Sequence, residues 1–271
     1  AVTIDLHGSI AVARGDYSRG KAFFEKSLGI RQAIGDRGGQ LRSLTLLGEA
    51  CLHLGAIEKA RLCYPQAQED AKEKGLADDQ AEINARMVLL EHSVGENEKA
   101  KQYGLAAAKK LSKLNHPSLL AVVLTSLGHA FAELGDYGSA AAAYGNANRV
   151  RTQLGQRAKL METVAGSALL DLRQGKGESA MTKIESVYTH LTKRGSDGME
   201  QPYRVYQTVF EVLENAGDER ATTLIEQANS ELQAAAEAIS DPMLRESFLD
   251  SVMENRAISY YYQGVKRRNA R

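Results

Sequence analysis

Cysteine is scarce in this chain. Only Cys51 and Cys63 occur, too few for the disulfide framework that holds many small secreted domains together. Both lie on apolar faces of predicted helices, where a free cysteine behaves as a small hydrophobic residue. The cysteine content favours a reducing compartment, and we expect a cytoplasmic protein.

Long apolar runs and an excess of charge of one sign are also missing. No run of about 18 apolar residues is present, and the first residues, AVTIDLHGSI, have no basic stretch followed by an apolar one. The 34 Lys and Arg residues balance 34 Asp and Glu residues, so bulk charge does not favour a nucleic-acid partner. We therefore expect neither a membrane nor a nucleic acid as a direct partner, and we interpret the basic residues 266–271 as a solvated helix end.

Catalytic and metal-binding motifs are absent as well. The chain has no HExxH motif, no GxxxxGK[ST] phosphate loop, and no GxGxxG after a strand. His53, His92 and His129 fall on neighbouring predicted helices, but they lie at different distances from the nearest turn glycine, so convergence on one ion is not expected. The sequence predicts a protein that is not an enzyme and that holds no cofactor and no metal.

A fixed internal repeat is present instead. The segment ELGDYGSAAAAYGNA (133–147) has the layout of ARGDYSRGKAFFEKS (13–27), HLGAIEKARLCYPQA (53–67), SVGENEKAKQYGLAA (93–107) and RQGKGESAMTKIESV (173–187). Each copy begins 40 residues after the last, and the shared turn glycines are Gly15, Gly55, Gly95, Gly135 and Gly175.

A second series of turn residues lies halfway between the first: Gly35, Gly75, Asn115, Gly155 and Gly195. Glycine and, less readily, asparagine adopt the left-handed conformation that ends many helices. Between these residues the apolar side chains recur at helical spacing, without the alternation typical of strands. The sequence predicts an all-α chain of helix pairs.

Small residues recur at the same phase in each pair. Gly20, Ala60, Ala100, Ala140 and Ala180 follow the first turn of each repeat by five residues, while a bulkier series includes Phe24, Tyr64 and Tyr144. Helices approach closely where side chains are small, so we expect large side chains to fill notches beside small ones.

With these residues in view, the chain resembles the tetratricopeptide repeat family. The resemblance is carried by Leu47 to Ala67 (LGEACLHLG…A…Y..A) and Leu127 to Ala147 (LGHAFAELGDYGSAAAAYGNA), with weaker copies over roughly residues 1–239. The 40-residue period is similar to the long-helix variety found in bacterial regulatory ATPases, transcription activators, nucleotide cyclases and scaffold proteins. The resemblance implies a right-handed α-solenoid with a concave groove.

The predicted domain bounds follow from the period. We expect a repeat array over 1–239, with repeats at 1–37, 38–77, 78–117, 118–157, 158–198 and 199–239, and a C-terminal capping helix with a basic tail over 240–271. Asp241 is the expected N-cap of that helix and Pro242 its first-turn residue.

Each predicted first helix keeps a stripe of residues that packing does not use, at i, i+3, i+4 and i+7 spacing. In tetratricopeptide proteins the first helices line the concave surface, so the resemblance implies a groove that binds a partner. The groove residues are Arg42, Glu49, His53, Glu82, Arg86, His92, Thr125, His129, Arg173, Tyr206 and Gln207.

The sequence therefore predicts a non-catalytic module that binds a protein, a peptide or a small ligand, as the sensing or scaffolding part of a larger regulatory protein. Three alternatives stay open at this point. They are a small-molecule effector domain of a transcription regulator, an architectural spacer that binds nothing, and an enzyme with an unrecognised site.

Overall fold

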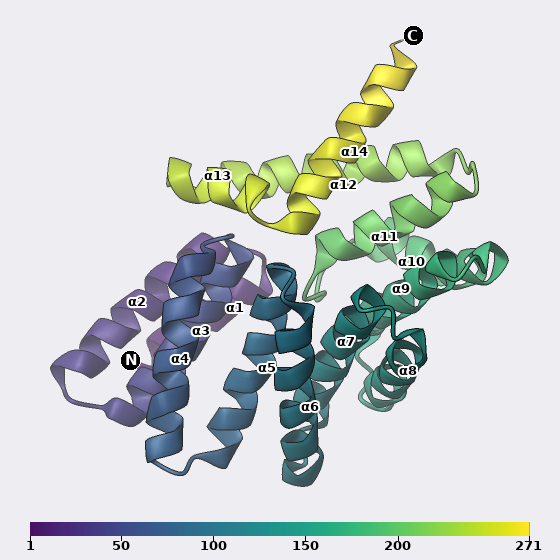
Figure 1. The fold of residues 1–271 in the computed structure, drawn as a ribbon. Coiled ribbons are helices and arrows are strands. Elements are labelled where there is room, and N and C mark those ends of the chain that lie inside the picture. The colour runs from purple at the N-terminus through teal and green to yellow at the C-terminus, as the bar shows by residue number, and fades with distance from the viewer. Residues whose placement is uncertain (271) are drawn as a thin grey trace. The chain divides into compact units, whose positions relative to one another are not determined.

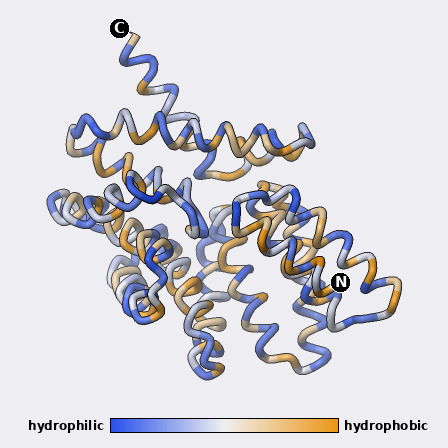
Figure 2. Tube along the Cα trace, turned by 180° about the vertical axis from the view of Figure 1, so that it is seen from behind, coloured by the Kyte–Doolittle hydropathy of each residue, from blue (hydrophilic) through white to orange (hydrophobic). Residues whose placement is uncertain are grey.

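The computed structural model describes residues 1–270, which form fourteen helices and no strand (Figure 1). The helices are α1 (Val2–Ala13), α2 (Tyr17–Ala33), α3 (Arg37–His53), α4 (Ile57–Glu73), α5 (Ala77–Ser93), α6 (Asn97–Leu114), α7 (Pro117–Glu133), α8 (Tyr137–Gln153), α9 (Arg157–Arg173), α10 (Gly177–Arg194), α11 (Pro202–Asn215), α12 (Arg220–Glu237), α13 (Pro242–Asp250) and α14 (Met253–Asn269). Hydrophobic and hydrophilic residues are interspersed along most of them, as is expected of helices that bury one apolar stripe (Figure 2). The predicted all-α class is confirmed.

The turns lie where the two glycine series place them. Every glycine of both series has a positive φ, between 66° and 80°, and Asn115 has a φ of 54°. Side chains with a β-carbon are strained in this region, which explains why glycine recurs at these positions. The sixth repeat turns at Gly217, with φ of 67°, so it departs from the 40-residue period there.

The notches are filled as the small-residue series predicts. A β-carbon on Gly48 would lie 2.6 Å from Cε1 of Tyr64, closer than packed carbons approach, so glycine is what admits the tyrosine ring. Ala60 and Ala140 are fully buried at their helix crossings. The repeat is therefore held by large side chains set into gaps that small residues leave.

These notches give a stability prediction. Ala60→Leu and Ala140→Leu should each lower the free energy of unfolding by about 1–3 kcal/mol, because extra methylenes must enter a packed crossing. Ser139→Leu, on the half-buried face beside Ala140, should cost much less. Thermal melts of the three variants check this, and equal shifts at all three positions would contradict it.

The chain divides into two compact units. Unit 1 contains Ala1–Asn115 and Ala235–Val252; unit 2 contains His116–Ala234 and the residues from Met253 onward. Helices α1 to α6 form three antiparallel pairs in unit 1, and α7 to α12 supply three pairs, up to Ala234, in unit 2. The segment after residue 239 thus forms two helices, and α13 and α14 belong to different units.

In unit 1, α13 packs on the turns of the first two repeats. The Asp241 carboxylate accepts the N–H groups of Met243 and Leu244, as the predicted N-cap should. Ser247 Oγ donates to the carbonyl of Gly55 over 2.9 Å, and Phe248 is buried. The helix thereby covers apolar surface at the end of this unit.

In unit 2, α14 packs on α11 and extends the layer of first helices. The Tyr261 hydroxyl donates to the Glu211 carboxylate over 2.8 Å, and its ring lies 4.8 Å from that of Phe210. Arg204 of α11 also pairs with Glu254 of α14. Phe210 and Glu211 lie on the face of α11 that α14 contacts. Helix α14 therefore covers this face of the sixth repeat.

Candidate functional site

In unit 1, the predicted groove residues of α3 and α5 come together. Arg86 Nη1 lies 2.6 Å from Glu49 Oε1 and ties α5 to α3, while Arg86 Nη2 lies 3.9 Å from Glu82 Oε1. The Arg86 and Glu49 side chains are half-buried, and Arg42 is exposed. The two first helices therefore share one face with both signs of charge.

The notch tyrosine of this repeat lies beneath that pair. Tyr64 is fully buried, and burial together with the nearby Glu49 carboxylate raises the pKa of its hydroxyl well above the usual value, although the Arg86 charge lowers it. The same residue thus packs the helix pair and places its polar end near the ion pair that crosses the first helices.

In unit 2, an equivalent pair joins α7 to α9. Arg173 Nη2 lies 2.7 Å from Glu133 Oε1, and both side chains are partly exposed. His129 Nδ1 lies 2.8 Å from the hydroxyl of the notch tyrosine, Tyr144. Burial raises the pKa of that hydroxyl, while the charges of Arg204 and Arg173 lower it.

Two predicted groove residues of unit 2 bond inward instead. Thr125 Oγ1 donates to the carbonyl of Ala121 over 2.8 Å and accepts from Arg151. The Tyr206 hydroxyl donates to Glu231 Oε1 over 2.9 Å, and the residue is fully buried. These side chains hold helices together, whereas the half-buried Gln207 bonds to Glu211 on the α11 surface.

Two predicted histidines in unit 1 lie at helix ends. His53 stacks on Tyr17 of α2, with ring centroids 4.4 Å apart, and His92 Nδ1 lies 2.7 Å from Asn97 Oδ1 at the start of α6. Within residues 1–270, no three His, Cys, Asp or Glu side chains gather as a metal site would require. Both histidines pack a first helix against a second helix.

The free cysteines are buried in unit 1. Burial raises the pKa of the Cys51 thiol to about 12 and also raises that of Cys63. Thiols that stay protonated at neutral pH are poor nucleophiles, so both residues act as small core side chains, as expected.

Sequence reasoning missed the buried arginines at the ends of second helices. Arg31 pairs with Asp5 in unit 1, and Arg151 lies near Glu162 and Glu200 in unit 2. Arg31 and Arg151 are three repeat periods apart, at a position where the other repeats carry Ala71, Leu111 and Leu191. The sequence could have identified these arginines, because each is a charged residue at a repeat position that is apolar in the repeats just named.

Glu162 is the most perturbed carboxylate of this kind. It accepts the N–H of Gln201 over 2.8 Å and that of Glu200, and so fixes the chain just before α11. Burial and the neighbouring Glu200 carboxylate raise its pKa from 4.5 to about 7, against the opposing effect of Arg151, 3.8 Å away.

This pKa shift predicts a pH dependence of stability. The folded state holds the Glu162 proton more tightly than the unfolded state. The stability that this difference gives the folded state is therefore fully present below pH 4.5 and is lost as the pH rises through about 7. We expect the free energy of unfolding to fall by on the order of 2–3 kcal/mol over that range on account of this group. Denaturant titrations at several pH values measure it.

The matched variants are Glu162→Gln and Glu178→Gln. The first should flatten the pH profile, because its side chain no longer titrates, and the second, on the exposed start of α10, should leave the slope in place. A slope that is unchanged in Glu162→Gln would contradict the prediction.

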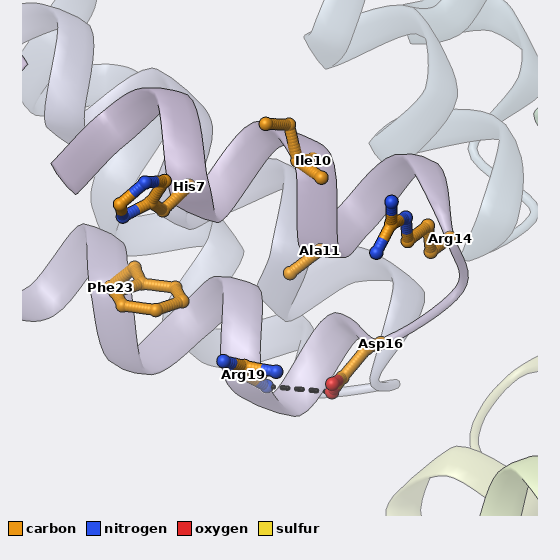
Figure 3. Close-up of a pocket in the computed structure, with 7 residues that line it drawn as sticks. All are labelled: His7, Ile10, Ala11, Arg14, Asp16, Arg19 and Phe23. Atoms are coloured by element: carbon orange, nitrogen blue, oxygen red, sulfur yellow. Dashed lines mark hydrogen bonds between the residues drawn. The ribbon is translucent and has the colours of Figure 1, made fainter. Parts of the chain in front are cut away.

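A surface hollow of about 220 Å³ lies away from the predicted stripe, between α1 and α2. It is lined by His7, Ile10 and Ala11 of α1, by Arg14 and Asp16 in the turn, and by Arg19 and Phe23 of α2, and Figure 3 shows His7 beside the Phe23 ring. The Asp16 carboxylate accepts the backbone N–H of Arg19.

No family model matches the sequence, and no curated protein matches it. Solved structures do match. A Rap protein complexed with Competence and Sporulation Factor is 15% identical, with a TM-score of 0.70 over 98% of this chain and 75% of that chain. The apo form of RapI is 13% identical, with a TM-score of 0.66 over 96% and 98%. BtubC (BKLC) from P. vanneervenii is 18% identical, with a TM-score of 0.60 over 82% and 92%.

At these identities the likeness concerns the fold. Together with the turns and notches described above, it confirms the predicted tetratricopeptide-like helical repeat. Among residues 1–270, no helix combines the length and apolarity that crossing a bilayer requires.

Proposed function

We propose that the chain is a non-catalytic module that binds a protein or peptide on the first-helix faces of its repeats. The observation that carries the proposal is the Arg86–Glu49 pair, which spans two first helices and remains partly open to solvent. In unit 2, the Arg173–Glu133 pair has the same character. Each pair offers a cation and an anion that a peptide can engage through its backbone or its side chains.

The mixed charge of these faces favours an extended peptide over a polyanion. Glu82 and Arg42 flank the unit 1 pair, and His129 flanks the pair of unit 2, so donors and acceptors alternate over each face. Support also comes from the neighbour that is complexed with Competence and Sporulation Factor, since a protein of similar fold is there seen to hold a partner. We infer that the module senses or scaffolds within a larger regulatory protein. The buried free thiols suit a reducing, cytoplasmic setting.

The proposal predicts that Arg86 and Arg173 contribute to the affinity for a peptide. Arg86→Ala and Arg173→Ala should each weaken binding by about tenfold or more, because a desolvated arginine contact contributes about 2 kcal/mol. Peptides are first selected on the wild-type chain from a display library of random linear sequences. The affinities of the variants for the selected peptides are then measured by calorimetry.

Lys109→Ala and Lys193→Ala are the controls, since both lysines are exposed on second helices. They should leave affinity unchanged, and melts should show that all four variants stay folded. Weaker binding in the lysine variants alone would place recognition on the second helices and overturn the proposal.

A further inference from the structure

The first residue of a second helix carries a packing side chain in most repeats. Helices α2, α4, α6 and α8 begin with Tyr17, Ile57, Asn97 and Tyr137, whereas α10 begins with Gly177. The Tyr17 ring stacks on His53 of the next first helix, and Ile57 packs on the core of unit 1. At this position the chain usually covers neighbouring surface with a side chain of its own.

Gly177 supplies no side chain at this position in unit 2. Its φ is not positive, so the backbone does not require glycine, and a β-carbon added to it would meet no atom within 4 Å. A hollow of about 400 Å³ lies beside it, between α9, α10 and α11, and we call it the Gly177 hollow. Besides the glycine, it is lined by Leu172, Glu178, Met181, Val212, Asn215 and Ala216.

The Gly177 hollow has apolar walls and a polar rim. Leu172 and Met181 are half-buried and Val212 is buried, while Glu178 and Asn215 are exposed. The lining residues all belong to unit 2, and they come from the fifth and sixth helix pairs. The hollow therefore lies between two consecutive repeats. A flat ring with one polar atom matches such a site, because the ring packs on the walls and the polar atom reaches the rim.

We propose that the Gly177 hollow binds a tyrosine side chain of a peptide, at the repeat position where α2 and α8 carry tyrosines of their own. The inference rests on the proposed function, since Leu172 of the hollow is the residue next to Arg173 of the Arg173–Glu133 pair. The tyrosine hydroxyl bonds at the rim, where it can donate to the Glu178 carboxylate or accept from the Asn215 amide.

Three small probes test the hollow on the whole chain by ligand-observed NMR titration. They are N-acetyl-tyrosinamide, N-acetyl-leucinamide and p-cresol, which has the phenol ring without the peptide groups. The tyrosine amide should bind with a dissociation constant on the order of 1 mM, as expected of so small a ligand. The leucine amide should bind at least about fivefold more weakly, because it has neither a ring nor a hydroxyl.

Variants locate the bound ring. Gly177→Tyr fills the hollow and should weaken binding of the tyrosine amide at least about tenfold, while Gly177→Ala leaves room and should bind as the wild type does. Gly145→Tyr is the matched control, since Gly145 is an exposed helical glycine of unit 2 whose added β-carbon also meets no atom within 4 Å. It should leave binding unchanged.

Thermal melts and a second wall variant give independent readouts. Gly177→Tyr should raise the melting temperature more than Gly145→Tyr does, because both gain helix propensity but only the first buries its ring. Met181→Glu should also weaken binding of the tyrosine amide, because it places a carboxylate in the apolar wall.

Three results would overturn the inference. They are equal affinity for the tyrosine and leucine amides, binding that survives both Gly177→Tyr and Met181→Glu, and binding of p-cresol without binding of the tyrosine amide. The last would assign the hollow to a free phenol.

The proposed function fails or holds separately. Arg173→Ala should weaken the selected peptides but leave the affinity for the tyrosine amide unchanged. Peptides that lose affinity in Arg173→Ala and keep it in Gly177→Tyr would remove the hollow from recognition and leave the first-helix face in place.

Discussion

Asp5→Ala is expected to lower the free energy of unfolding by about 3–5 kcal/mol, because it removes the closer and only buried one of the two carboxylates beside a buried arginine. The other carboxylate, Asp36, is 46% exposed, and its Oδ2 lies 3.6 Å from Arg31 Nε. Arg31 Nη1 lies 2.6 Å from Asp5 Oδ2, and both side chains are 3% exposed. The same guanidinium donates to the Gly39 carbonyl and to Ser43 Oγ, neither of which carries a charge. Denaturant titration of the variant measures the loss.

Two further variants separate the ion pair from other causes. Glu58→Ala removes an exposed partner of Arg61 and should cost well under about 1 kcal/mol, as surface pairs do. Asp5→Leu combined with Arg31→Met replaces the pair with apolar side chains and should recover much of the loss. A small effect of Asp5→Ala would show that Asp36 and the neutral acceptors satisfy Arg31 without the Asp5 carboxylate.

The 40-residue period predicts the fold well because each turn has a local cause. A glycine with positive φ, such as Gly155, and a buried notch residue, such as Ala140, are set by backbone sterics and by one helix crossing. Both recur in the sequence at the same phase. The Asp5–Arg31 pair cannot be predicted in this way, because its partners come from two helices and the period carries neither residue into the next repeat.

The sequence predicts the location of the candidate site but not the bonding of each of its residues. Helical spacing identifies the face of α3, α5, α7 and α9 that packing leaves over, and the Arg86–Glu49 and Arg173–Glu133 pairs lie on it. Spacing does not tell which side chain on that face finds a partner inside the protein. Tyr206 bonds to a carboxylate that α12 supplies, and only the structure brings the two together.

The burial of individual side chains in the C-terminal segment is also not predicted by the sequence alone. The Asp241 cap and the apolar spacing after it predict a helix at this place, and α13 begins there. The same spacing suggests burial of both Met243 and Phe248, yet Met243 is 80% exposed and Phe248 is 2% exposed. A helix as short as α13 has one narrow contact with its unit, so its orientation is decided by the surface it meets.

Phe248→Ala is therefore expected to lower the free energy of unfolding by about 3–5 kcal/mol, as the loss of a buried phenylalanine typically does. The ring lies beside the first turn of unit 1, where Gly15 and Tyr17 share a small cavity with Ala235 and Ile239. The ring that the substitution removes leaves a void that the turn cannot fill, because Gly15 has no side chain.

Met243→Ala is the matched control, since it shortens a large side chain on the same helix with little loss of buried surface, and it should cost less than about 0.5 kcal/mol. Hydrogen exchange of both variants locates the effect: in Phe248→Ala the amides of α13 should exchange faster, while those of α14, which belongs to the other unit, should keep their protection. If the two variants melted together, α13 would not be a packed part of unit 1, and the burial of Phe248 would contribute nothing to its stability.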